Sequence, residues 1–200
     1  MNPVNVLAKL WKRLMLRGSE FGGSYGKLRL LYSLEDPWDM ASPREQHRFA
    51  QTLAQLQSMA PRFGSVLEFG CGEGHQSLSL IGISDRLHGV DISPAAVARA
   101  GNRCPQASFE VAALEDALTI IPDQRFDLIT ACEVLYYAMD IDDILGKLQS
   151  RTDRLYVSNY KPRSDKMRAS FAGDGWRRLE DIRFEDTVWE CFVWEAPERR

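Results

Sequence analysis

The stretch VLEFGCGEGHQS, residues 66–77, places three glycines within five positions, directly after a short apolar run. The apolar run predicts a buried strand over 65–69, and the glycines predict the turn that leads from this strand into a helix. Each glycine costs conformational entropy on folding. Two interpretations therefore compete at this point: a tight structural turn, or a backbone that must approach a ligand closely.

Strands and helices alternate on both sides of this turn. Apolar runs predict strands, and helical spacing predicts helices between them. The first five strands are apolar without alternation, which is typical of a parallel sheet covered by helices on both faces. We expect an α/β fold: a Rossmann-like, doubly wound, seven-stranded and mostly parallel sheet with an antiparallel C-terminal hairpin and an N-terminal helical cover. The expected strands are 65–69, 86–90, 108–112, 126–131, 154–158, 178–184 and 187–194, and the expected helices are 43–59, 75–81, 94–101 and 140–150.

Two of these helices have clear start signals. Ser42 and Glu45 have the spacing of a capping box, and Pro43 suits the first helical position. Ser93, which also precedes a proline, begins the later helix in the same way, and Gly101 is expected to end it.

The bulk composition indicates one globular domain. A chain of 200 residues with 44% hydrophobic content can bury a sizeable core. We assign residues 1–60 to an N-terminal helical cover and residues 61–200 to the core of the same domain. The formal net charge of −3 shows no basic footprint of the kind that duplex binding leaves, so a nucleic-acid partner is not favoured.

Four cysteines are scattered along the chain without a C-x-x-C pair. This spacing argues against a zinc site and against a disulfide framework, so we expect a reducing, cytoplasmic setting. Apolar and basic side chains alternate over residues 4–17 at helical spacing. A helix of this kind packs on the domain or lies on an anionic membrane surface, and peripheral membrane contact through residues 4–17 is the second hypothesis for it.

Asp91 gives the glycine turn a possible function. It ends the second expected strand, 21 residues after Gly70, and an acidic residue there can accept hydrogen bonds from both hydroxyls of a ribose. Ligands of open α/β sheets bind at the carboxyl ends of the strands, where the turn and the acid meet. Together they predict a site for a cofactor that contains adenosine.

Two residues of the turn argue against a nicotinamide cofactor. The NAD fingerprint ends in a small residue where this chain has His75, and Glu73 directs negative charge toward the place of a pyrophosphate. The chain also lacks the G-x-x-x-x-G-K-[ST] motif of a P-loop. A ligand that joins adenosine to a sulfonium cation suits this acidic turn better.

Three segments together resemble the class I S-adenosylmethionine-dependent methyltransferases: VLEFGCGEG, then GVDIS, then RFDLITACEVLYYAMD. The matching motif residues are Glu68, Gly70, Gly72, Gly74, Asp91 and Asp127. Within that superfamily, DPWDMASPREQHR and CEVLYY are similar to the NodS-like branch, the nodulation N-methyltransferases that act on an amino sugar of a chitooligosaccharide. The resemblance implies S-adenosylmethionine as the cofactor and no metal.

The resemblance also implies roles for single residues. Glu133, after the fourth strand, would bind an ammonium or hydroxyl group of the acceptor, and Tyr136 would stack on a sugar or face the sulfonium. Arg48 would pair with the methionine carboxylate. Structural roles stay open for Glu133 at a helix start and for one of Tyr136 and Tyr137 in the core. The expected cofactor-binding residues are Trp38, Arg48, Glu68, Gly70, Cys71, Gly72, Gly74, Asp91, Ile92, Leu114 and Glu115.

One position departs from the family pattern. After the third strand, family members often carry an acid that binds the adenine amino group, where this chain has Ala113. Either Glu115 takes over this role, or backbone groups near Leu114 hold the adenine. A solvated loop pair of Glu115 and Asp116 is the structural alternative.

The favoured function is methylation of an amino or hydroxyl group of a small molecule, such as a saccharide or a natural-product precursor, with N-methylation first. The basic stretch NYKPRSDKMR, residues 159–168, favours an RNA or protein methyltransferase instead, because such stretches track phosphates. The fourth strand, however, lacks the [DN]-P-P-[YFW] turn of many base-amine enzymes. A catalytically inactive cofactor-binding partner subunit is the third possibility, against which the intact glycine loop weighs.

Overall fold

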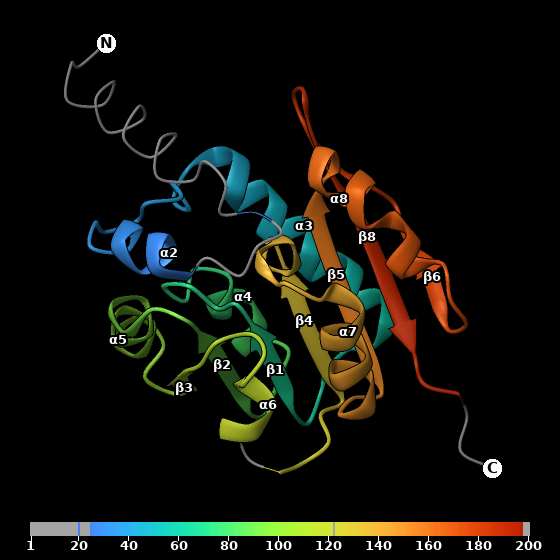
Figure 1. Ribbon diagram of the computed structural model, residues 1–200, viewed down its shortest axis with the longest axis horizontal. Coiled ribbons are helices and arrows are strands. Elements are labelled where there is room, and N and C mark those ends of the chain that lie inside the picture. The colour runs from blue at the N-terminus through green and yellow to red at the C-terminus, as the bar shows by residue number, and fades with distance from the viewer. Residues whose placement is uncertain (1–19, 21–24, 122, 198–200) are drawn as a thin grey trace.

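The computed structural model describes residue 20 and residues 25–121 and 123–197. These residues form one eight-stranded sheet with helices on both faces (Figure 1). The segment 4–17, for which membrane contact was a hypothesis, lies outside the described residues. Within the described ranges, no helix is long and apolar enough to cross a bilayer.

The sheet has the doubly wound order β3-β2-β1-β4-β5-β8-β6, and β7 also pairs with β8. Strands β1 to β5 run parallel, whereas β8 runs antiparallel to β5, β6 and β7. The chain reverses direction across the sheet between β1 and β4, and this switch point is where such folds bind ligands. The strands are β1 (Val66–Phe69), β2 (Leu87–Asp91), β3 (Ser108–Val111), β4 (Leu128–Cys132), β5 (Arg154–Tyr160), β6 (Trp176–Arg178), β7 (Ile182–Phe184) and β8 (Thr187–Glu195).

The helices cover the two faces of the sheet in two groups. Helices α3 and α4 pack on one face, and α6, α7 and α8 pack on the other (Figure 1). The α-helices are α2 (Tyr25–Leu31), α3 (Pro43–Met59), α4 (Ser77–Ile81), α5 (Pro94–Arg103), α6 (Ala117–Ile120), α7 (Ile141–Ser150) and α8 (Lys161–Met167), and the 3-10 turns are η1 (Leu135–Tyr137) and η2 (Arg168–Phe171).

The alternation of side chains along β1 decides which face each residue serves. Leu67 and Phe69 belong to the apolar cluster under α6, α7 and α8, and Val66 belongs to the cluster under α3 and α4. Glu68 therefore points toward the face of α3 and α4. This placement brings a carboxyl group of the first strand next to the start of α4.

The expected bounds of α3 are confirmed at both ends, Pro43 and Met59. The hydroxyl of Ser42 accepts a hydrogen bond from the backbone N–H of Glu45 at 3.5 Å, as the capping signal predicts. The Glu45 carboxylate, however, accepts from Arg48 Nε at 2.8 Å and thus turns along the helix. Since this carboxylate is used elsewhere, its predicted return bond to Ser42 is replaced by an ion pair inside α3.

The expected end of α5 at Gly101 is wrong. The helix continues to Arg103, and the N–H of Cys104 still donates to the carbonyl of Ala100 at 2.8 Å. No atom lies within 4 Å of the place where a Cβ of Gly101 would stand, so this glycine occupies an ordinary helical position.

The single strand expected over 178–184 is interrupted, which raises the strand number from seven to eight. Arg178 pairs with Phe192 and Ile182 pairs with Trp189, so three residues on this strand oppose two on β8. This is a β-bulge, with one extra residue on the edge strand. Asp181 sits in it and accepts from the side chains of Arg178 and Arg183, which stabilises the bend.

Candidate active site

The carboxyl ends of β1, β2 and β4 open into a cavity of about 290 Å³. Residues of α2, α3 and the segment between them form its other wall. Of the residues expected to contact a cofactor or acceptor, all except Gly74 and Glu115 line this cavity. The structure thus brings together the turn after β1, the acid after β2, the N-terminal cover and the residues after β4.

The glycine turn is required by packing as well as by the cavity. Gly70 and Gly74 have φ angles of 81° and 78°, a region that L side chains avoid. A Cβ on Gly70 would lie 2.5 Å from Cγ2 of Val134, and one on Gly74 would lie 3.0 Å from Cα of Ala100. Gly70 lets the turn pass close to the segment after β4. Gly74 packs against Ala100 of α5 and does not line the cavity, so its role is to hold the turn in place.

Asp91 fixes the turn to the end of β2. Its carboxylate accepts the backbone N–H groups of Gly72 and Ser93, each at 3.0 Å. Burial raises the pKa of Asp91 to about 6, while these N–H groups favour its charged form. The carboxylate lines the cavity next to Ile92, where an acceptor for ribose hydroxyls was expected.

Glu68 is the most strongly perturbed acid of the cavity wall. It lies 4% exposed at the end of β1, and the hydroxyl of Ser77 donates a short hydrogen bond to it. Burial raises its pKa to about 8, and the Ser77 bond and the charge of Arg48 only partly oppose this rise. Glu68 is therefore largely protonated near neutral pH, and its contribution to the wall is a hydrogen-bonded carboxyl group with little charge.

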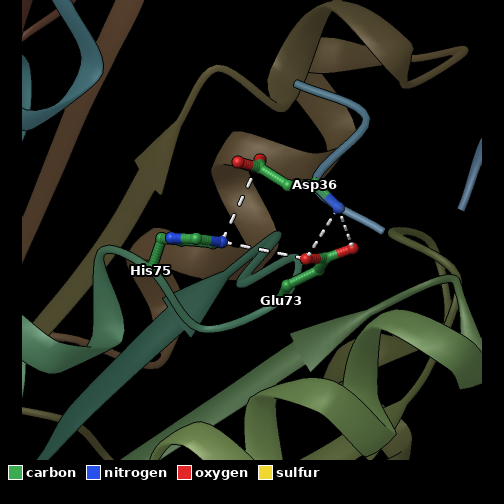
Figure 2. A group of neighbouring side chains, drawn as sticks. All are labelled: Asp36, Glu73 and His75. Carbon is green, nitrogen blue, oxygen red and sulfur yellow. Dashed lines mark hydrogen bonds and ion pairs between the residues drawn. The ribbon is translucent and has the colours of Figure 1, made fainter. Parts of the chain in front are cut away.

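Glu73 does not present free charge to the cavity, which corrects the expectation from the sequence. Its oxygens accept the N–H of Asp36 at 3.0 and 3.1 Å (Figure 2). One of them also accepts from Nε of Arg99 at 2.9 Å. His75 Nε2 points between the two carboxylates, 3.7 Å from Glu73 and 4.0 Å from Asp36 (Figure 2). Because both oxygens of Glu73 are engaged, this group fastens the segment after α2 to the glycine turn.

Arg48 lines the cavity and already binds protein groups with part of its guanidinium. It is 3% exposed, donates to Glu45 at 2.8 Å and donates from Nη1 to Gln76 Oε1 at 3.1 Å. Arg44, which the sequence analysis did not single out, also lines the cavity, and its side chain is 45% exposed. A carboxylate entering the cavity would thus meet two guanidinium groups, of which Arg44 is the more accessible.

The end of β4 presents Glu133 in a strained backbone conformation. Its φ of 58° is unusual for a residue with a side chain, and such strain is found mostly at functional sites. One carboxylate oxygen accepts the N–H of Tyr160 in a short hydrogen bond, and the other accepts the Tyr136 hydroxyl at 3.2 Å. Burial raises the pKa of Glu133, and the nearby cations Arg48 and Arg163 oppose the rise.

Aromatic rings connect this end to the cover. The rings of Tyr136 and Tyr137 lie 4.5 Å apart, and Trp38 lies 6.5 Å from Tyr137. Tyr32 meets Trp38 edge to face at 6.3 Å. All four line the cavity, so its wall offers both flat apolar faces and the hydroxyl groups of three tyrosines.

Besides Arg44, the sequence analysis did not find Tyr25 and Arg163 in the cavity wall. Tyr25 of α2 lines the cavity and donates its hydroxyl to Glu115, which explains why Glu115 does not reach the cavity itself. Arg163 of α8 enters the cavity wall over the ring of Tyr136. The basic stretch 159–168 was the available signal for Arg163, but it indicated phosphates instead of a contact with Glu133.

The other cations of that stretch are engaged with acids. Lys161 lies 2.7 Å from Asp165, and Arg168 lies 2.6 Å from the same carboxylate. Glu190, which is fully buried, also accepts from Arg168 and lies 3.7 Å from Lys161. This network pairs two of the cations at α8 with acids, which weakens the case for a phosphate-tracking surface there.

Comparison with known proteins gives one family. The family model of nodulation protein S (NodS) matches residues 25–158. Nodulation protein S of Sinorhizobium fredii is 34% identical over 138 residues, which are 68% of this chain and 63% of that protein. The chain therefore aligns with less than two thirds of the length of this curated relative.

Solved structures show the same fold. The crystal structure of N-methyltransferase NodS from Bradyrhizobium japonicum WM9 in complex with S-adenosyl-L-homocysteine has a TM-score of 0.73 at 21% identity and covers 88% of this chain and 100% of that one. The magnesium protoporphyrin IX methyltransferase of Synechocystis PCC 6803 with bound S-adenosylmethionine has a TM-score of 0.66 at 17% identity, with 88% and 94% covered.

Proposed function

Because the chain belongs to the nodulation protein S family, we propose that it transfers a methyl group from S-adenosylmethionine to an amine of a saccharide acceptor. The observation that carries this proposal is the meeting of Asp91 and Glu133 on the wall of one cavity. Asp91 suits an adenosine, and Glu133 suits an acceptor group that must lose a proton. An amino sugar of a chitooligosaccharide is the acceptor that the family resemblance favours.

The residues of the cavity fit this cofactor. The carboxylate of Asp91 is held in place by two backbone N–H groups and would accept the ribose hydroxyls. Ile92 and Leu114 would flank the adenine, and Arg44 would meet the carboxylate of the methionine part together with Arg48. The aromatic wall attracts a cation such as a sulfonium. When bound, the cofactor supplies a methyl group that is already activated by the positive charge on sulfur.

The chain itself contributes orientation, exclusion of water and one proton acceptor. Holding two reactants in a productive geometry can lower a barrier by about 7–11 kcal/mol in favourable cases. A protonated acceptor amine must also give up a proton before its nitrogen can attack, and Glu133 is the carboxylate at the correct end of the cavity. The neighbouring rings of Tyr136 and Tyr137, which are tilted against each other, offer faces for a sugar ring.

The proposed function also suggests which part of the chain covers the cofactor and in which compartment the protein works. We infer that the part of residues 1–60 that includes α2 and α3 covers the cofactor, and that the core begins near residue 61. The cysteines Cys71, Cys104, Cys132 and Cys191 are all free thiols. Free thiols throughout favour a reducing compartment, and we propose the cytoplasm.

Calorimetry with the full chain tests the cofactor first. We expect S-adenosylhomocysteine to bind with micromolar affinity and NAD to show no heat of binding under the same conditions. Binding of NAD alone would overturn the proposal.

The acceptor is tested next, with radiolabelled methyl donor and two matched oligosaccharides. We expect label to enter a chitooligosaccharide with a free amino group and not its fully acetylated counterpart. Equal labelling of both would indicate methylation of a hydroxyl group instead of the amine. Labelling of neither, together with binding of S-adenosylhomocysteine, would contradict the saccharide acceptor and leave the cofactor assignment in place.

A further inference from the structure

Arg163 lies where the proposed acceptor site and the last part of the sheet meet. It belongs to α8, which follows β5 directly, and its side chain is 24% exposed. The guanidinium carbon stands 4.4 Å above the ring centre of Tyr136, and Nη1 lies 3.3 Å from the hydroxyl of that tyrosine. The same Nη1 is 3.7 Å from a carboxylate oxygen of Glu133. One side chain thus touches both residues that the sequence predicts for the reaction.

The guanidinium is fixed from its other side. One carboxylate oxygen of Glu20 accepts from Nε of Arg163 at 2.9 Å and lies 2.8 Å from Nη2. This charge-assisted contact holds one edge of the guanidinium. Since the planar group is also stacked on a ring, it has little freedom to turn away from Glu133.

The charges around Glu133 come from four elements. Arg163 approaches it from α8, and Arg48 acts on it from α3 together with the opposing charge of Glu45. Tyr136 of η1 donates a hydroxyl hydrogen bond, and the backbone of Tyr160 at the end of β5 donates an N–H. Arg48 is already paired with Glu45 inside α3. Arg48 has the larger electrostatic effect on Glu133, and Arg163 is the cation whose side chain reaches within 4 Å of its carboxylate among the described residues.

We propose that Arg163 is the positioning residue of the acceptor site, and that its guanidinium holds the Glu133 carboxylate ionised and aligned against Tyr136. This inference rests on the proposed function. An acceptor that arrives as an ammonium gives one proton to an oxygen of Glu133, which leaves the nitrogen lone pair free to form the new C–N bond while the C–S bond breaks and its electron pair stays on sulfur. Glu133 can take this proton only if it is ionised when the acceptor binds.

Three variants separate the charge of Arg163 from its shape. Arg163→Met removes the charge and keeps much of the apolar stem, whereas Arg163→Lys keeps the charge and loses the fork and the stacking. Arg177→Met is the control, because Arg177 on β6 is 57% exposed and its ion pair with Glu195 lies outside the cavity.

The first measurement is the titration of the Glu133 carboxyl carbon by NMR, in glutamate-labelled protein without acceptor, with Glu133→Gln to assign the signal. We expect the midpoint to move upward by about one pH unit in Arg163→Met, because an opposite charge at this range lowers a carboxyl pKa by roughly 1–3 units. The midpoint in Arg163→Lys should lie nearer to that of the parent, and the midpoint in Arg177→Met should equal that of the parent. An unchanged midpoint in a folded Arg163→Met variant would overturn the proposal, whether or not a saccharide proves to be the acceptor.

The second measurement is the pH profile of methyl transfer. We expect the acid limb of kcat/KM to move up in Arg163→Met by the same amount, with a KM for the acceptor about tenfold higher at pH 7 and an affinity for S-adenosylhomocysteine within twofold of the parent. Arg163→Lys should raise the acceptor KM without moving the acid limb. Should Arg163→Met fail to fold, Arg163→Gln removes the charge with a polar side chain and should shift the NMR midpoint in the same direction. No shift in that folded variant would contradict the role of the anchored guanidinium.

Discussion

At the glycine-turn end of the cavity Asp91 is held by the nearby residues Gly72 and Ser93, whereas at the β4 end the polar groups come from segments up to 143 positions apart. The first end uses backbone N–H groups, and the cover adds one of them, which Asp36 donates to Glu73. The second end uses the side chains of Glu133, Tyr136 and Arg163, which meet only after β4, β5 and α8 have packed. A cofactor end built locally and an acceptor end built from distant segments should respond differently to mutation.

The largest expected effect lies at Asp91, the residue that joins β2 to the glycine turn. Asp91→Ala removes the acceptor for the ribose and leaves two buried N–H groups without a partner. Loss of hydrogen bonds to a charged group should weaken S-adenosylhomocysteine roughly 100- to 1,000-fold by calorimetry. Asp127→Asn is the control, because that carboxylate binds the N–H of Ser65 at the opposite end of the sheet. If both variants weakened the ligand equally, Asp91 would have no special role in the cavity.

The next effect concerns Glu68 and the pH dependence of stability. Its pKa is raised from 4.5 to about 8, so its stabilising contribution is complete below about pH 4.5 and is lost as the pH rises through 8. In thermal unfolding, the free energy of unfolding of the parent should fall by a few kcal/mol between these two pH values, relative to that of Glu68→Gln. As a control, Glu180→Gln, a substitution at an exposed position between β6 and β7, should follow the parent at every pH. If the free energy of unfolding depended on pH in the same way for the parent and for Glu68→Gln, Glu68 would be ionised in the folded protein.

The locally encoded features were predictable from the sequence. The start of α3 follows from Ser42 and Pro43. The glycine turn and Asp91 could be placed at one edge of the sheet because parallel strands share their carboxyl ends. Glu133, which the family resemblance indicated, lies one residue beyond β4. In each case the signal is a short pattern with a fixed geometric meaning.

The features that depend on tertiary contacts were not predictable. Helix α8 has seven residues and begins with a lysine and a proline, so its sequence does not show that Arg163 meets Glu133. The partner of Glu73 is a backbone N–H from the cover, which no side-chain pattern reveals. The bulge between β6 and β7 arises from pairing with β8 and leaves no spacing signal. Long-range partners decide these details, and one sequence does not name them.

The acceptor end can be weakened separately at Glu133. Glu133→Gln keeps the shape and a hydrogen-bond acceptor but cannot take a proton, so methyl transfer should fall roughly 100-fold, with the affinity for S-adenosylhomocysteine unchanged. Glu133→Gly should lose activity at least as fully. It should unfold no earlier than the Gln variant, because glycine removes the strain of a φ of 58°. Full activity in either variant would exclude a proton-accepting role, and a parallel loss of cofactor affinity would show that the two ends are not independent.

The smallest effect is expected at Glu115, which tests where the cofactor end stops. The sequence suggested this acid for the adenine amino group, yet it does not line the cavity, and its two oxygens accept the Tyr25 hydroxyl at 2.8 and 2.7 Å. Glu115→Gln keeps one acceptor for that hydroxyl, so α2 should stay in place and the affinity for S-adenosylhomocysteine should change by less than about threefold. Tyr25→Phe removes the hydroxyl donor and so breaks the same hydrogen bond without changing Glu115. If Glu115→Gln weakened the ligand tenfold while Tyr25→Phe left it unchanged, Glu115 would contact the adenine directly and the cofactor end would extend past β3. If both variants had the same small effect, the adenine is held by backbone near Leu114, and Glu115 serves only to fasten α2 over the cavity.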